Sequence, residues 1–349
     1  PAFLSRTVLK MVKLAPVRFA IAVALLIVCA LASVSSVMAQ GVQSKAVPVG
    51  IYSIDDYNLL SSSYVDGVLI RTSWEACEPT QGKYDFSRIA KIVSYARSKG
   101  KKVSIAMLTF RTPKWLLADS TIATMTGPNG KVPAPWDTKA QGLFEKLIAA
   151  MSATVVDGYA LKDHPSVANI NTTILGADSL RVVTPLSTAD TAKFKDGVLK
   201  SIAIWRRYFT SSSKAYYVGM FAMAGSTGLT STRDIRDSIL AQFPDTNFYQ
   251  ELLTGKSPNG PLFDMVNEVK SKTSIMFQWY GVITEQNTTW KNGDWVKNAQ
   301  GVNVDTPGLG FSHGYYDLGA KYFECYPTDL KNSAYTADYQ SWYKIIHGK

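Results

Sequence analysis

The stretch that decides the fold reads V-D-G-V-L-I-R-T-S-W-E-A-C-E-P-T-Q-G-K-Y-D-F and spans residues 65–86. Its body, residues 68–70, is a short and largely β-branched apolar run of the kind found in buried parallel strands. The run ends in charged and aromatic side chains, and a helix is predicted to begin near Ser87. An apolar strand with a polar carboxyl end, followed by a helix, is the repeating unit of α/β barrels, whose chemistry lies at the carboxyl ends of the strands.

Outward from this unit, the sequence predicts eight strands, each followed by a helix or a loop, as a single (β/α)8 TIM barrel requires. The expected strands are 47–54, 68–70, 102–108, 167–175, 215–224, 274–283, 308–312 and 320–325. The expected helices are 88–98, 138–161, 189–209, 231–242, 261–271 and 336–346. Segments 119–135 and 243–260 are expected to be irregular. No repeat, linker or low-complexity segment indicates a second folded domain.

The amino-terminal segment has the pattern of a secretory signal peptide. Basic residues Lys13 and Arg18 precede an apolar core at 19–32, and small residues at 37–39 mark a cleavage position. The core is shorter than the ~20 residues that a spanning helix needs, although a membrane anchor is the alternative interpretation. We therefore expect a secreted or periplasmic protein without stable membrane insertion. Residues 1–39 would be the signal peptide with upstream residues, and residues 40–349 the TIM barrel.

Charge and cysteine content narrow the functional classes. The formal net charge is +10, and residues 1–39 carry four basic and no acidic residues, which leaves 10 − 4 = +6 on the remainder. The basic residues are scattered and no nucleic-acid motif accompanies them, so they indicate a solvated surface and not a nucleic-acid partner. Cys77 and Cys325 remain after the leader. They can form a disulfide or stay as two buried thiols, and the sequence leaves both alternatives open.

The stretch I-R-T-S-W-x-x-x-E-P-x-x-G-x-Y-D-F, followed by a helix, resembles the second βα unit of (β/α)8 glycoside hydrolases. The closest likeness is the β-galactosidase type of family forty-two, over roughly residues 49–117. Pro113-Lys114-Trp115-Leu116 matches a P-x-W-L that shapes the sugar pocket in those enzymes. The resemblance implies a barrel that acts on an oligosaccharide or polysaccharide. No P-loop or dinucleotide fingerprint appears, and His164 and His313 are too scattered for a zinc site, so no cofactor or metal is expected.

Glycosidic cleavage uses two carboxyl groups that flank the anomeric carbon, about 5–5.5 Å apart for retention and about 6.5–9.5 Å apart for inversion. In the resembled enzymes the acid is the Glu of an Asn-Glu pair that ends strand four, and the nucleophile is a Glu that ends strand seven. Here the fourth expected strand has no Asn-Glu, and Asp178 is the only carboxylate near its end. Asp178 can equally cap a loop or helix. Glu285 and Glu324 are the two nucleophile candidates, and a structural pair of Glu324 with Arg71 is the alternative for the second.

Side chains that follow the expected strands are candidates for substrate binding. These candidates are Arg71, Trp74, Glu78, Trp115, Trp279 and Tyr280. Aromatic residues in these positions stack on sugars or belong to the core, and Glu78 is expected to shape its loop. The function indicated is a secreted glycoside hydrolase. A carbohydrate-binding barrel of the cell envelope without catalysis is the alternative, and a structural role in polysaccharide export is a weaker third. The oligomeric state, the sugar and the stereochemical outcome are open.

Overall fold

The computed structural model describes residues 47, 49–211, 213–257, 259–288, 297–300, 302 and 304–349. Residues 45–349 form one compact unit. The expected signal peptide, residues 1–39, lies outside the described residues, so its prediction stays untested. Among the described residues, no helix is long and apolar enough to cross a membrane.

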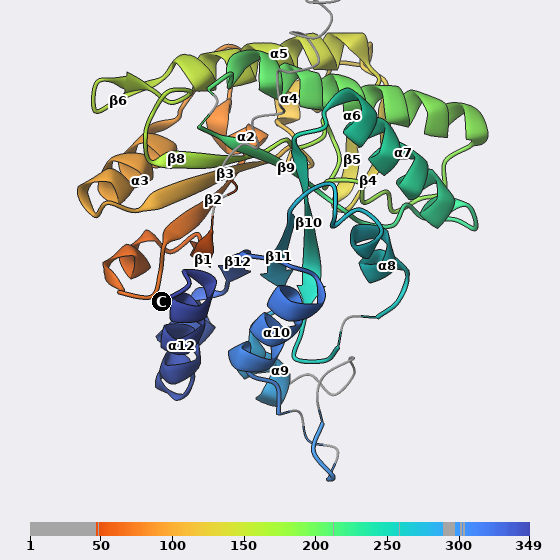
Figure 1. Cartoon of the computed structure of the whole chain (residues 1–349). Coiled ribbons are helices and arrows are strands. Elements are labelled where there is room, and N and C mark those ends of the chain that lie inside the picture. The colour runs from red at the N-terminus through yellow and green to blue at the C-terminus, as the bar shows by residue number, and fades with distance from the viewer. Residues whose placement is uncertain are drawn as a thin grey trace, which may run out of the picture. The chain divides into compact units, whose positions relative to one another are not determined.

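Eight parallel strands close into a barrel in the order β1-β12-β11-β10-β9-β8-β3-β2, with helices on the outside (Figure 1). This confirms the predicted (β/α)8 fold. The barrel strands are β1 Gly50–Ile54, β2 Gly67–Ser73, β3 Lys102–Leu108, β8 Val167–Asn171, β9 Ala215–Gly219, β10 Thr246–Leu253, β11 Ile275–Trp279 and β12 Tyr322–Cys325. Two antiparallel hairpins stand apart from the barrel, β4 Thr124–Gly127 with β5 Gly130–Pro133, and β6 Val155–Val156 with β7 Tyr159–Ala160.

The longer helices follow the barrel strands and cover them. They are α3 Ser87–Ser98, α5 Thr138–Ala153, α6 Thr188–Tyr208, α7 Gly228–Gln242 and α12 Thr336–Ile346. The shorter helices are η1 Tyr57–Ser61, α2 Trp74–Cys77, α4 Lys114–Leu117, α8 Pro261–Asn267, α9 Ile283–Thr288, α10 Pro307–Ser312, η2 His313–Asp317, α11 Pro327–Lys331 and η3 Ser333–Tyr335. Helix α3 buries Ile89, Ile92, Val93 and Ala96, the apolar spacing that predicts it.

Two predictions about barrel strands are wrong, and the errors compensate in the count of eight. Segment 119–135, also expected to be irregular, contains the hairpin of β4 and β5, which lies outside the barrel. The segment 243–260, expected to be irregular, contains β10, which pairs with β9 and β11. The expected strand 308–312 is instead helix α10, with Pro307 in its first turn and the Thr306 side chain accepting from the Leu309 amide at 3.4 Å. Pro at the start of a helix and a Thr cap are standard helix-start signals, which outweigh the short apolar run.

The sixth barrel strand, β10, was missed because its sequence, T-N-F-Y-Q-E-L-L, mixes polar and apolar residues. In a parallel barrel a strand buried on both faces usually reads as continuously apolar. Here Tyr249 packs in the barrel interior with Tyr217 and Tyr322, whereas its neighbour Phe248 belongs to the core between barrel and helices. The barrel interior therefore contains hydroxyl-bearing side chains. One of these side chains, Tyr249, lines the cavity described in the next section.

The fifth helix ends earlier than expected. The predicted 138–161 ends at Ala153, and a β-hairpin of β6 and β7 follows. Its turn residues Asp157 and Gly158 have φ of 50° and 85°. Both therefore lie in the left-handed region that two-residue hairpins favour, and Asp-Gly is a sequence signal for that turn. The apolar residues that continue past Ala153 belong to the hairpin.

Candidate functional site

A cavity opens among the carboxyl ends of the barrel strands. Its empty volume is about 400 Å³, including the part open to solvent. The polar residues around it come from β2, β8, β10, β12 and the loop after β8, and they are Arg71, Asn171, Thr173, Asp178, Ser179, Tyr249, Glu251 and Glu324. This is the end of the barrel at which residues from several strands converge.

Glu324 lies on β12 and is fully buried. Its Oε1 accepts hydrogen bonds from the hydroxyls of Tyr322 at 2.9 Å and Tyr217 at 3.3 Å. Its Oε2 has no hydrogen-bond partner in the described part of the protein. Burial raises the pKa of Glu324 to about 8, against a weaker lowering by the Tyr322 hydrogen bond. The raised pKa favours the protonated form of Glu324 at neutral pH, and because Oε1 already accepts two hydrogen bonds, we assign the proton to Oε2.

A series of buried hydrogen bonds leads from Asn169 to Glu324. Asn169 donates to the Ser104 hydroxyl at 2.8 Å, and that hydroxyl lies 2.7 Å from the Tyr322 hydroxyl. Tyr322 then donates to Glu324. Side chains so connected have their orientation set before a ligand arrives, because each hydrogen bond restricts its neighbour.

Glu251 is the site residue that sequence reasoning missed. It lies on β10, where Tyr249 donates to its Oε1 at 2.8 Å and Arg181 donates to its Oε2 at 2.9 Å. Residues two apart on a strand face the same side, so Tyr249 and Glu251 both point into the cavity. No period-two alternation of polar and apolar residues marks 246–253, which reads T-N-F-Y-Q-E-L-L, so periodicity gives no signal for Glu251.

Asp178 lies in the loop after β8 and does reach the cavity. Burial raises its pKa to about 6, although nearby Arg181 opposes the rise. Arg181 Nη1 lies 2.9 Å from Asp178 Oδ2, and Nη2 lies 2.9 Å from Glu251 Oε2. One guanidinium thus bridges two carboxylates. Gly176 and Ser179 have φ of 67° and 57°, which bends the loop on both sides of Asp178.

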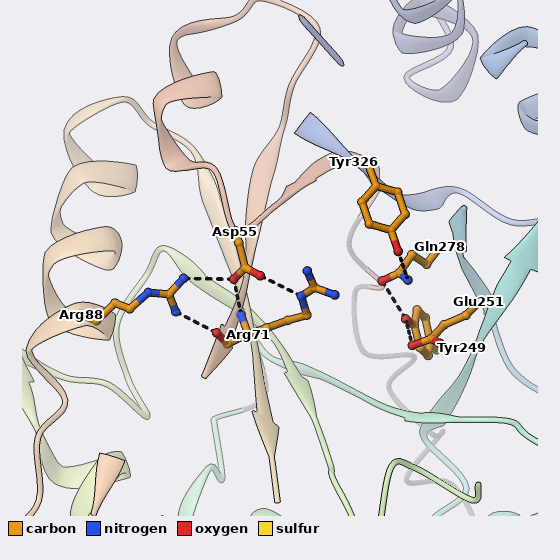
Figure 2. A network of polar contacts seen from close by, with 7 residues as sticks. All are labelled: Asp55, Arg71, Arg88, Tyr249, Glu251, Gln278 and Tyr326. Carbon is orange, nitrogen blue, oxygen red and sulfur yellow. Dashed lines mark hydrogen bonds and ion pairs between the residues drawn. The ribbon is translucent and has the colours of Figure 1, made fainter. Parts of the chain in front are cut away.

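Arg71 does not form the direct pair with Glu324 that was the structural alternative for this glutamate; its ion-pair partner is Asp55. Its Nε lies 2.8 Å from Asp55 Oδ2, and its backbone amide donates to Asp55 Oδ1 at 2.8 Å. Arg88 contacts the same carboxylate at 3.1 Å. Figure 2 shows the terminal nitrogens of Arg71 turned toward Tyr249, Gln278 and Tyr326. Arg71 therefore presents a positively charged edge to the cavity. Its charge lowers the pKa of Glu324 without a direct bond, although burial outweighs it.

Three of the predicted binding residues form a structural cluster beside the barrel. Trp74 is fully buried and donates to Glu78 Oε2 at 2.7 Å. Glu78 Oε1 accepts from the Gly82 amide at 2.8 Å, and the Glu78 carbonyl accepts from Trp115 Nε1 at 2.9 Å. Glu78 thus shapes its loop, as expected. Of the two alternatives for Trp74, sugar platform or core, the structure shows core.

The two predicted aromatic binding residues at the end of β11, Trp279 and Tyr280, differ in exposure. Trp279 is 1% exposed and packs edge-on against Phe311, so it is core. Tyr280 is 46% exposed. On β11 itself, Gln278 accepts from the Tyr249 hydroxyl at 3.0 Å and donates to the Tyr326 hydroxyl at 3.3 Å (Figure 2).

Glu285 does not line the cavity. It lies in α9, where its charge contributes to the raised pKa of Asp329, after the larger effect of burial. The strand-end placement expected for it fails because the chain turns into a helix at Ile283, whose amide donates to Asp329 at 2.7 Å. Asp178 and Glu324 are therefore the two predicted catalytic carboxylates that reach the cavity.

Cys77 and Cys325 are both buried free thiols. Cys77 lies 3.2 Å from the Thr72 hydroxyl, and burial raises its pKa to about 11. The described residues contain no group of three or more His, Cys, Asp or Glu side chains that could hold a metal ion.

Comparison with known proteins agrees with this frame. The model of glycoside hydrolase family 42, described as beta-galactosidase, matches residues 54–141. The first part of the barrel resembles this family. A beta-galactosidase from Arthrobacter sp is 25% identical over 126 residues, which cover 35% of this chain and 18% of that relative. The match therefore spans less than a fifth of the relative.

Two solved structures of similar topology are more distant. Xylanase B from Clostridium stercorarium F9 is 12% identical, with a TM-score of 0.46 over 80% of this chain and 85% of the other. The catalytic domain of an endoglucanase from Thermobifida fusca is also 12% identical, with a TM-score of 0.45 over 86% of this chain and 91% of the other.

In this glycoside hydrolase-like barrel, the two strand ends at which the resemblance implies catalytic glutamates carry other residues. The fourth barrel strand, β8, ends at Asn171, which Thr172 and Thr173 follow. The seventh, β11, places Gln278 beside Glu324 of β12. Carboxylates line the same cavity from the sixth strand, the eighth strand and the loop after the fourth.

Proposed function

We propose that the barrel is a glycoside hydrolase that binds an oligosaccharide or polysaccharide at the carboxyl ends of its strands and cleaves a glycosidic bond. One observation carries the proposal. A single cavity holds a carboxylic acid that is protonated at neutral pH, Glu324, together with Glu251 and Asp178, whose charges an arginine offsets. Carboxyl groups in different ionisation states around one cavity are what glycosidic cleavage requires.

In this proposal Glu324 is the general acid. Its proton on Oε2 would pass to the leaving oxygen as the glycosidic bond breaks, because a group with a pKa of about 8 is a proton donor across the neutral range. Arg71 would donate to substrate oxygen atoms from the edge that Asp55 leaves unoccupied. Tyr280, exposed beyond the end of β11, would stack on a sugar ring.

The test is hydrolysis of a panel of para-nitrophenyl glycosides, with β-galactoside, β-glucoside, β-xyloside and α-arabinoside as first members. We expect turnover by the full chain and its loss in Glu324→Gln. Turnover that persists unchanged in Glu324→Gln would remove Glu324 from the mechanism.

A second candidate is a barrel that binds saccharide without cleaving it. Asn171 and Gln278 favour it, because amides at the ends of the fourth and seventh strands can hydrogen-bond sugar hydroxyls but cannot exchange protons. Binding of oligosaccharides measured by calorimetry, together with no hydrolysis of any glycoside in the panel, would establish this function in place of the first.

Export is part of the same proposal. The basic region and apolar core in 1–39 support a cleaved signal peptide, which would place the barrel in the periplasm or outside the cell with its polysaccharide. Amino-terminal sequencing of exported protein tests this, with Gln40 as the expected first residue. Retention of Met11 would indicate an anchor.

A further inference from the structure

The pair Tyr249 and Glu251 has the geometry of a nucleophile with its general base. The Tyr249 hydroxyl donates to Glu251 Oε1 at 2.8 Å, within the hydrogen-bond reach that such pairs show. Both residues line the cavity from β10. Tyr249 is 4% exposed, so its hydroxyl is shielded from bulk water but borders the space that a ligand would occupy.

A third group holds the base in place. Arg181 Nη2 lies 2.9 Å from Glu251 Oε2, and Nη1 lies 2.9 Å from Asp178 Oδ2. The guanidinium carbon of Arg181 lies 4.1 Å from the centre of the Phe221 ring. Glu251 thus has one oxygen fixed by arginine and the other directed at the Tyr249 proton. The hydroxyl of Tyr249, the carboxylate of Glu251 and the guanidinium of Arg181 are thus linked in that order by hydrogen bonds, as nucleophile, base and orienting group are in hydroxyl-based covalent catalysis.

The carboxylates themselves are poorly placed to attack carbon. Asp178 and Glu251 each form an ion pair with Arg181, which withdraws charge from their oxygens. Glu324 is protonated at neutral pH and is the proton donor. At the seventh strand stands the amide of Gln278, which accepts from the same Tyr249 hydroxyl at 3.0 Å. None of the three carboxyl groups is therefore well placed as a nucleophile, whereas the Tyr249 hydroxyl has a base, Glu251, within hydrogen-bond distance.

We propose that Tyr249 is the catalytic nucleophile and Glu251 its general base, an inference that rests on the proposed glycosidase function. The Tyr249 oxygen attacks the anomeric carbon while its proton passes to Glu251. The bond from that carbon to the leaving oxygen breaks as Glu324 gives its proton to that oxygen. The product of this step is a tyrosyl glycoside.

Water completes the reaction and restores every group. It attacks the anomeric carbon and gives a proton to the Glu324 carboxylate, while the Tyr249 oxygen leaves and recovers its proton from Glu251. Two displacements at one carbon give retention of configuration. Burial and the nearby charge of Glu251 raise the pKa of Tyr249 well above 10, so attack must be coupled to proton transfer.

The experiment traps the intermediate on the full chain. A deoxyfluoro glycoside with a dinitrophenolate leaving group, made from whichever sugar of the panel is hydrolysed, is incubated with the protein. Intact mass and peptide mapping then locate the glycosyl group. We expect one glycosyl group on Tyr249, stable to alkaline hydroxylamine because its linkage is an acetal. A glycosyl ester of Glu251, Asp178 or Glu324, which hydroxylamine cleaves, would overturn the inference, as would an inverted product.

Matched variants complete the test. Tyr249→Phe keeps the ring and should lower turnover at least about 1,000-fold, because the nucleophile itself is removed. Turnover within about tenfold of wild type would overturn the inference. Tyr216→Phe is the control, since Tyr216 is an equally buried tyrosine whose hydroxyl donates to the Phe209 carbonyl away from the cavity. A thermal melt of both variants separates loss of folding from loss of chemistry.

The two proposals fail in different ways. If the wild-type chain hydrolyses no glycoside of the panel, the proposed function is wrong and the nucleophile assignment falls with it. If wild type turns substrate over but the adduct lies on a carboxylate, the glycosidase stands and only Tyr249 loses its role.

Discussion

The β2–α3 region and the β10–β12 region each bury a glutamate, but the two carboxyl groups differ in how their oxygens are hydrogen-bonded. Glu78, beside β2, accepts from Trp74 on one oxygen and from the Gly82 amide on the other. Glu324, on β12, has one oxygen engaged by two tyrosines and one with no partner in the described chain. A carboxylate with both oxygens occupied fixes a loop. A buried carboxyl group with a raised pKa and one oxygen without a hydrogen bond is a candidate for chemistry.

This difference also separates the resembled region from the proposed chemistry. The family match covers 54–141, where Glu78 is structural, whereas the groups to which the proposal assigns chemistry lie at 178–324. The first region therefore carries the resemblance in fold, whereas the proposed activity depends on the second region.

The largest expected effect is on Glu324. Glu324→Gln should lower turnover about 100- to 10,000-fold, because the amide cannot donate a proton. At acid pH its thermal stability should be near wild type, since the amide replaces a neutral acid of the same shape. At neutral pH the variant should be the more stable, because wild-type Glu324 must take up a proton to fold. Steady-state kinetics with a thermal melt on the same sample checks both expectations. Glu285→Gln is the control, because Glu285 lies outside the cavity and its loss should leave turnover unchanged.

A change at Glu78 should do the reverse. Glu78→Ala leaves the buried Trp74 indole and the Gly82 amide without an acceptor, which should lower the unfolding free energy by about 2–4 kcal/mol. Turnover per folded molecule should be retained. Urea denaturation with active-site titration measures the two quantities, and Glu75→Ala, at an exposed carboxylate of the same turn, supplies the comparison. A stable but inactive variant would show that the two glutamates do not differ as described.

The pH dependence of stability sharpens the contrast further. Glu324 has a folded-state pKa of about 8 against an ordinary value of 4.5. Between these pH values the folded chain holds a proton that the unfolded chain releases, so the unfolding free energy falls as pH rises. The slope from this group is at most about 1.4 kcal/mol per pH unit. The slope should be present in wild type and absent in Glu324→Gln. Equal slopes for the two proteins, in denaturation at several pH values, would contradict burial of the acid.

The smallest expected effect concerns Tyr280. Tyr280→Ala should weaken oligosaccharide binding about three- to tenfold, on the order of 1 kcal/mol, through loss of a stacking surface. Calorimetry measures it. Tyr316→Ala removes another exposed ring, 67% accessible, and should leave binding unchanged. Equal losses in both variants would mean that the effect is not specific to the mouth of the barrel.

Much of the frame could be predicted from sequence because apolar periodicity reports burial. Strand 102–108 is found with its exact bounds, and the opening motif becomes β2 and α2, with α3 following from Ser87 as expected. The sixth strand could not be found in this way, because inward residues such as Tyr249 and Glu251 are polar for reasons of the site and disrupt the apolar run. Glu251 was lost with its strand. The ion-pair partner of Arg71 could not be predicted from sequence either. Whether Arg71 pairs with Asp55 or with Glu324 depends on how the strands are placed in the folded barrel.

The position of Glu324 at the seam of the barrel has a consequence for how the protein matures. Strand β12 pairs with β1, so Tyr322 lies beside Gly50 and Glu324 beside Tyr52, at opposite ends of the folded sequence. Contacts of such long sequence separation carry a high loop-closure entropy and form late in folding. Until the first and last strands meet, Glu324 faces water, loses its proton at neutral pH, and cannot serve as an acid. Under the proposed function, a nascent or incompletely closed barrel would therefore lack its acid, and activity would arise only when closure is complete.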